Sequence, residues 1–232
     1  RGVPGAYART IEAAGWARAN RLPVQINTCV WKESAAWLGA MASQVEALGA
    51  VFWEVFFLVP MGRGSLLGGL TASECEEAFE VLRQAQGRRT YIVKVTEAPH
   101  YRRYLAQRKD RERGRVRALG DEEGGVPLAH RGVNAGDGFL FISHRGDIYP
   151  SGFLPIPAGN VRRHRIADVY RTSGLFLDLR DPDRLKGRCG RCEFRRLCGG
   201  SRSRAYALTG DWLAEDPWCA YDPPAAGAAP AF

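Results

Sequence analysis

The chain has 232 residues, of which 45% are hydrophobic and 25% charged, and its formal net charge is +8. These proportions are those of an ordinary globular protein. No apolar run is long enough to cross a bilayer and no signal peptide is recognisable, so we expect no membrane partner and a reducing, cytoplasmic location. The arginines are spread along the whole chain, so the net charge is weak evidence for nucleic-acid binding and we expect no such partner.

The first half of the chain alternates predicted helices and strands. Alanine-rich residues 5–19 favour a helix, and the alternating pattern of 22–30 favours a strand. Ser34 is expected to cap a helix that runs to residue 48. Residues 51–59 form a nearly continuous apolar run, which suits a strand buried on both faces of a parallel sheet.

Thr71 and Glu74 have the spacing of a capping box, which predicts a helix to about residue 86, and a strand is expected at 91–96. Helix and strand thus alternate three times, which predicts consecutive βα units and a parallel sheet. Three strands are too few to complete an α/β domain. We therefore expect that the chain, which begins at Arg1 without an initiator methionine, is part of a longer protein.

The character of the sequence changes at residues 107–135, where mixed charges and glycines predict a linker or mobile loop. Residues 139–149 are expected to form a hairpin and 166–179 one or two short helices. The tail at 224–232 is rich in alanine and proline and is expected to be disordered.

Four of the six cysteines form the most informative pattern. Cys189, Cys192 and Cys198 have C-x2-C-x5-C spacing, and Cys219 follows about twenty residues later. Four thiolates that converge in this way suit either zinc or an iron–sulfur cluster. Disulfide-rich domains are shorter and denser in cysteine, so two disulfides are the weaker interpretation.

The region around these cysteines resembles the C-terminal SPASM or twitch domain of radical S-adenosylmethionine (SAM) enzymes, most of all those associated with haem biosynthesis. The matching stretches are residues 146–155, 159–161, 189–206, 209–211 and 216–219. Upstream, residues 23–28, 58–64 and 96–103 resemble the ends of the last three strands of the family's partial barrel.

The resemblance implies an α/β fold in four parts. Residues 1–106 would be the C-terminal βα units of a partial (β/α)6 TIM barrel, and 107–135 a charged linker or loop. Residues 136–223 would form a small α+β iron–sulfur domain of the SPASM/twitch type, followed by the disordered tail at 224–232.

The C-x3-C-x2-C motif that holds the SAM-cleaving cluster in this family is absent. Cys29 and Cys75 are isolated residues and are expected to be ordinary buried thiols. The resemblance therefore implies that any catalysis belongs to a longer parent protein. It leaves open whether this chain alone is an enzyme, and its catalytic residues stay unknown.

Serine occupies positions 151 and 201, where the family would use cysteine for a first auxiliary cluster, and serine oxygen is a poor ligand beside thiolate. The resemblance thus implies one auxiliary [4Fe–4S] cluster, fully ligated by Cys189, Cys192, Cys198 and Cys219 and used for electron transfer. Arg202 and Arg204 could donate to its sulfurs or could pair with Asp211 or Asp216.

Side chains at the carboxyl ends of barrel strands face the active site. By that geometry Asn27 and Arg63 are candidates for SAM binding. The remaining candidates would contact substrate, and their basic groups would suit a polycarboxylate; they are Glu97, His100 and Arg103.

The family resemblance implies part of a radical SAM oxidoreductase that modifies a tetrapyrrole haem precursor or a peptide through a 5′-deoxyadenosyl radical. The electron donor would be a protein such as ferredoxin or flavodoxin. Two alternatives remain at this point. One is a four-cysteine zinc module that binds nucleic acid or protein, and the other is a truncated, catalytically inactive remnant.

Overall fold

The computed structural model describes residues 3–88, 90–108 and 133–224. We call 3–108 the N-terminal part and 133–224 the C-terminal part. Most of the predicted linker at 107–135 and of the predicted tail at 224–232 lies outside the described residues. Within the described ranges, every helix is too short or too polar to span a bilayer.

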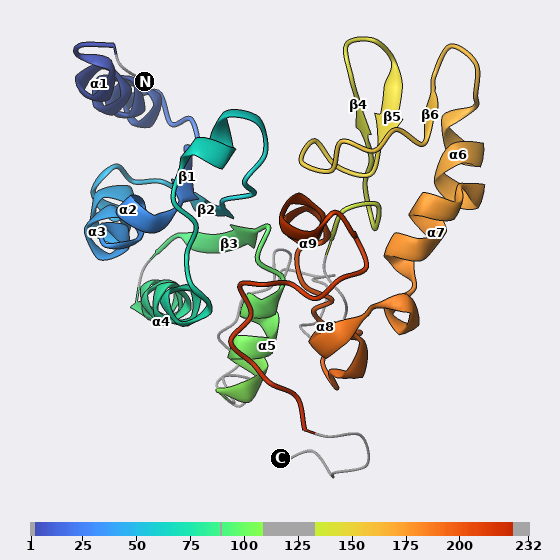
Figure 1. Cartoon of the computed structure of the whole chain (residues 1–232). Coiled ribbons are helices and arrows are strands. Elements are labelled where there is room, and N and C mark those ends of the chain that lie inside the picture. The colour runs from blue at the N-terminus through green and yellow to red at the C-terminus, as the bar shows by residue number, and fades with distance from the viewer. Residues whose placement is uncertain (1–2, 89, 109–132, 225–232) are drawn as a thin grey trace, which may run out of the picture.

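The N-terminal part is organised around a three-stranded parallel sheet, which confirms the α/β class. Strands β1 (Gln25–Val30), β2 (Phe52–Phe57) and β3 (Ile92–Thr96) pair in that order. The register places Asn27 beside Glu54 and Glu54 beside Lys94. Figure 1 shows α2, α3 and α4 on one side of this sheet and α9 with β4–β6 on the other.

Helices α1 (Ala6–Ala19), α4 (Ala72–Arg88) and α5 (His100–Gln107) alternate with the strands, and η1 (Gly62–Leu66) is a single 3-10 turn. The capping box is confirmed, because the Glu74 amide donates to Thr71 Oγ1 and the Thr71 amide to Glu74 Oε2. The helix expected at 34–48 is instead two helices, α2 (Lys32–Ala35) and α3 (Leu38–Ala47). Ser34 lies inside α2, where its Oγ accepts the Trp31 amide, so it closes the first turn rather than preceding it.

One face of the sheet packs on the helices and the other carries polar groups. Trp53, Val55 and Phe57 alternate along β2 into a core shared with Phe79 of α4. The opposite face of β2 carries Glu54, which is 9% exposed, between the half-buried Phe52 and Phe56. No residue of β2 is exposed, which agrees with the prediction of a strand covered on both faces. The Glu54 carboxylate accepts hydrogen bonds from side chains of both neighbouring strands and an ion pair from β3; these partners are Gln25, Thr96 and Lys94.

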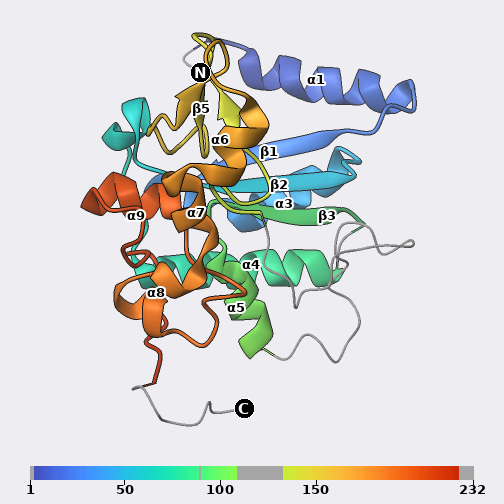
Figure 2. The same ribbon diagram turned by 90° about the vertical axis from the view of Figure 1, so that its right-hand side faces the viewer.

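The C-terminal part begins with a small antiparallel sheet of β4 (Phe141–Ile142), β5 (Asp147–Tyr149) and β6 (Gly159–Asn160), which confirms the predicted hairpin. Short helices follow: α6 (Ile166–Thr172), α7 (Gly174–Arg180), α8 (Gly187–Arg191) and α9 (Arg202–Thr209), with the 3-10 turn η3 (Pro182–Arg184). In Figure 2 the strands of the parallel sheet run across the view, and α7 and α9 lie near their carboxyl ends.

Phe79 is the centre of an aromatic group in the N-terminal core, with its ring 5.2 Å from Phe57 and 4.8 Å from His100. We expect Phe79→Ala to lower the free energy of unfolding by about 3–5 kcal/mol, because it leaves a cavity in a fully buried site. Urea denaturation measures this loss. Leu66→Ala is the control, since Leu66 is 85% exposed; an equal loss in both variants would contradict the assignment of this core.

Candidate metal centre

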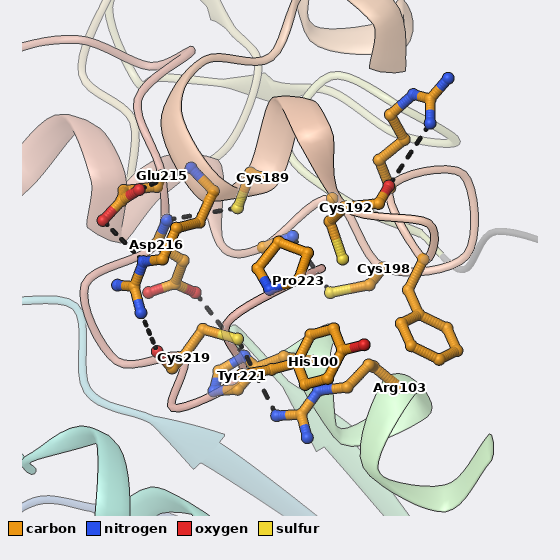
Figure 3. Close-up of a pocket in the computed structure, with 15 residues that line it drawn as sticks. His100, Arg103, Cys189, Cys192, Cys198, Glu215, Asp216, Cys219, Tyr221 and Pro223 are labelled. Carbon is orange, nitrogen blue, oxygen red and sulfur yellow. Dashed lines mark hydrogen bonds and ion pairs between the residues drawn. The ribbon is translucent and has the colours of Figure 1, made fainter. Parts of the chain in front are cut away.

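The four clustered cysteines line one hollow in the C-terminal part. Cys189 lies in α8, Cys192 caps the carboxyl end of α8, Cys198 ends the following turn, and Cys219 lies on the returning chain. Figure 3 shows their sulfurs turned toward the same space. The structure thus brings together the four residues that the sequence singled out as metal ligands.

The turn after Cys198 depends on glycine. Gly199 and Gly200 adopt φ angles of +70° and +64°, which side chains strongly disfavour. A Cβ atom on Gly200 would lie 2.7 Å from Arg202 Nη2 and 3.3 Å from Cys189 Sγ. The chain can therefore pass this close to the sulfur only because position 200 has no side chain.

Two of the cysteine sulfurs accept a backbone N–H group. The Gly200 amide lies 3.3 Å from Cys198 Sγ and the Asp216 amide 3.5 Å from Cys189 Sγ. Hydrogen bonds of this kind stabilise negative charge on sulfur.

Two guanidinium groups also approach the sulfurs. Arg202 Nη2 lies 3.9 Å from Cys189 Sγ, and Arg103 Nη2 lies 3.9 Å from Cys219 Sγ. Arg202 is fully buried, and its other donors reach carbonyl oxygens of Gly200, Trp212 and Ala214. Within the described residues it forms no ion pair with a carboxylate. Its charge also contributes, after Lys186, to the lowered pKa of Asp211, so Asp211 is a more distant counter-charge. An N–H donor and a positive charge beside Cys189 Sγ suit negative charge on that sulfur.

The thiols themselves are shielded from water. Burial raises the pKa of Cys192 to about 12 and also raises the pKa of Cys189, Cys198 and Cys219. The four groups are therefore neutral thiols until a metal displaces their protons. In the part of the chain that the structure describes, no three His, Cys, Asp or Glu side chains are gathered tightly enough to hold one metal ion.

Beside the hollow lies a buried ion pair within the C-terminal part, and its arginine also contacts the N-terminal part. Arg204 and Asp216 have no exposed surface, and their charged atoms lie 2.7 and 2.9 Å apart. Arg204 also donates to the Glu97 carbonyl at 2.8 Å, and its guanidinium lies 4.3 Å from the Trp218 ring centre. Burial alone would raise the pKa of Asp216, but the charge of Arg204 holds it far below its usual range.

Glu97 provides the second link between the parts. It follows β3 with a φ of +59°, and its half-buried carboxyl group accepts the hydroxyls of Ser201 at 2.5 Å and Ser203 at 3.1 Å. Burial raises the pKa of Glu97. Ser201 Oγ also accepts the Arg204 amide and so caps α9. The serine at a position where the family would use cysteine therefore has a structural partner of its own.

The three residues predicted to contact substrate lie where the two parts meet. His100 has no exposed surface and Arg103 is 4% exposed, while Glu97 is half-buried. His100 Nε2 lies 3.3 Å from Cys75 Sγ and its Nδ1 3.6 Å from Asp216 Oδ2. Burial lowers the pKa of His100 to about 3, so the ring is neutral near pH 7. Their role toward substrate stays a prediction.

The two residues predicted to bind SAM lie elsewhere in the N-terminal part. Asn27 is exposed on β1, where its Oδ1 accepts Gln25 Nε2 at 2.8 Å, and Arg63 is exposed in η1. Cys75 is buried as expected, but the expectation for Cys29 is wrong, since Cys29 is exposed. Side chains alternate along a strand, and Cys29 shares the polar face with Gln25 and Asn27 rather than the core face.

Asp216 is the site residue that the sequence weighted too little. The sequence placed it in the matching stretch 216–219 and named it as one of two possible partners of Arg202 or Arg204. In the structure its carboxylate accepts hydrogen bonds from the Arg204 guanidinium and from the amides of Ser201 and Trp218. The only local signal was its position three residues before Cys219. Of the two roles considered for these arginines, Arg202 approaches a cysteine sulfur and Arg204 pairs with Asp216.

We expect Asp216→Asn to destabilise the protein by about 3–5 kcal/mol, because it leaves the Arg204 charge buried without a counter-ion. Chemical denaturation measures the loss. Asp183→Asn is the control, since Asp183 pairs with Arg195 and Arg196 at the exposed surface and its removal should matter far less. Similar losses in both variants would contradict the role given to the buried pair.

Comparison with known proteins gives relatives along almost the whole chain. This chain is 37% identical over 223 residues to AdoMet-dependent heme synthase of Methanosarcina barkeri. The aligned region covers 96% of this chain and 63% of that protein. Against AdoMet-dependent heme synthase of Oleidesulfovibrio alaskensis the identity is 36%, over 96% of this chain and 57% of the relative. PqqA peptide cyclase of Methylocella silvestris is 26% identical over 96% of this chain and 56% of the cyclase.

Among solved structures, the crystal structure of Streptococcus suis SuiB bound to S-adenosylmethionine superposes with a TM-score of 0.60. The match covers 92% of this chain and 49% of SuiB at 15% identity, so it concerns the fold alone. No protein-family model matches the chain. The chain spans about three fifths of the length of the curated relatives it matches.

Proposed function

The chain belongs to the radical SAM/SPASM family of these relatives, and we propose that it is the C-terminal portion of a radical SAM oxidoreductase. Residues 1–106 contribute βα units of the partial barrel and 136–223 an auxiliary cluster domain of the SPASM/twitch type. The substrate is a tetrapyrrole haem precursor or a peptide. Relatives named for heme synthesis, pre-heme d1 synthesis and peptide cyclisation support both classes, and the higher identity of the heme synthases favours the tetrapyrrole.

The cysteine hollow carries this proposal. Cys189, Cys192, Cys198 and Cys219 would hold one [4Fe–4S] cluster, one sulfur for each iron. The backbone amides of Gly200 and Asp216, and the guanidinium of Arg202 beside Cys189 Sγ, suit the negative charge of such a group. When bound, the cluster would accept and pass on single electrons.

The sequence around the cysteines favours a cluster over zinc. The stretches at 146–155 and 159–161 belong to the SPASM/twitch pattern, and a zinc ribbon would not need them. The zinc module therefore has weaker support than the cluster.

The remaining roles complete the proposal. Asn27 and Arg63 would contact SAM in the full-length parent, and Glu97, His100 and Arg103 would act toward substrate. A cytoplasmic carrier such as ferredoxin or flavodoxin would supply electrons. Because His100 and Arg103 are buried and Glu97 is half-buried where the two parts meet, a variant at any of them must be checked for stability before a change in activity is attributed to substrate binding.

Anaerobic reconstitution of the chain with iron and sulfide tests the cluster. We expect a brown protein that absorbs near roughly 400 nm and holds about four irons and four sulfides per chain. Cys198→Ser should reduce the iron content and the absorbance, because it replaces a thiolate by a poor oxygen ligand. Cys29→Ser is the matched control and should leave both unchanged. A colourless protein that binds one zinc per chain would overturn the proposal.

A further inference from the structure

Arg103 connects the N-terminal part to the cysteine hollow. It lies in α5, and its Nη2 is 3.9 Å from Cys219 Sγ while its guanidinium is 5.4 Å from the Tyr221 ring centre. Figure 3 shows this side chain reaching under Cys219 from α5. Cys219 and Tyr221 both belong to the C-terminal segment, so Arg103 spans the boundary between the two parts.

The charge of Arg103 is held in place by the N-terminal part. Both terminal nitrogens donate to the Glu76 carboxylate of α4, and Nη1 also donates to Gln107 Oε1 at 2.7 Å. Arg103 is 4% exposed and the Glu76 side chain 24%. Glu76 lies closer to solvent than Arg103, so its negative charge only partly cancels the positive charge of Arg103 at the Cys219 sulfur.

We propose that Arg103 is a positioning residue that raises the reduction potential of the auxiliary cluster, and that Glu76 moderates this effect from α4. This inference rests on the cluster proposed above. One-electron reduction by an external reductant makes the cluster more negative by one charge, while Arg103 stays protonated and no bond is made or broken. A fixed cation and an N–H donor beside Cys219 favour the more negative state, so they raise the potential.

Arg103 and Glu76 carry opposite charges, so removing one or the other should shift the midpoint potential of the cluster in opposite directions. Arg103→Met removes the cation and should lower the midpoint potential. Glu76→Gln removes the opposing negative charge, keeps a side chain of the same size, and should raise it. A merely structural role for this pair would weaken the fold in both variants but would not move the potential in opposite directions.

The experiment uses the full 232-residue chain reconstituted anaerobically, with dithionite as the reductant and the midpoint potential read by electron paramagnetic resonance. Iron content and thermal midpoint are measured in parallel. Arg103→Lys should retain most of the wild-type potential because it keeps the charge. Arg180→Met is the matched control, since Arg180 also lies over a tyrosine ring, at 4.7 Å from Tyr170, but donates to carbonyl groups rather than to sulfur.

A lower potential in Arg103→Met and a higher one in Glu76→Gln, with Arg180→Met unchanged, support the inference. A wild-type chain that takes up no cluster overturns the proposed function and this inference with it. If the wild type takes up the cluster but both variants keep the wild-type potential, or both shift it in the same direction, the inference alone is overturned. If Arg103→Met fails to load, the sign of the Glu76→Gln shift decides.

Discussion

The buried ion pair between Arg204 and Asp216 is the interaction on which the rest of the structure depends. Neither charge reaches solvent, so the pair is stable only because its remaining hydrogen-bonding atoms are satisfied. Arg204 donates to the carbonyl group that follows β3, and Asp216 accepts the amides of Ser201 and Trp218. The end of the parallel sheet, the start of α9 and the segment that carries Cys219 are thereby fixed in one arrangement.

This arrangement makes the cysteine hollow a property of both parts of the chain. The Asp216 amide donates to Cys189 Sγ, while the Asp216 carboxylate holds Arg204. Trp218, one residue before Cys219, packs into the hydrophobic core of the N-terminal part. Binding of a metal group would therefore stabilise the contact between the parts as well as the cysteine loop, since a ligand that binds only the folded arrangement shifts the equilibrium toward it.

The parallel sheet shows which features local sequence patterns predict and which they do not. The alternation of helix and strand predicted the parallel sheet, and the capping box at Thr71 predicted where α4 begins. The expectation for Cys29 was wrong, because the sequence of a strand does not reveal which of its two faces is covered. Glu54 is accommodated by Gln25, Lys94 and Thr96, which come from strands far away in the sequence.

The sequence by itself determined the βα order, the grouping of the cysteines and the family, because these follow from spacing and from motifs that are local to the chain. Only the tertiary structure decided that Ser201 donates to Glu97, that Arg202 approaches the Cys189 sulfur, and that Arg103 approaches Cys219. Each of these depends on contacts between residues separated in the chain, up to 116 positions in the case of Arg103. Burial then determines the energy of those contacts, and burial is a property of the packed molecule.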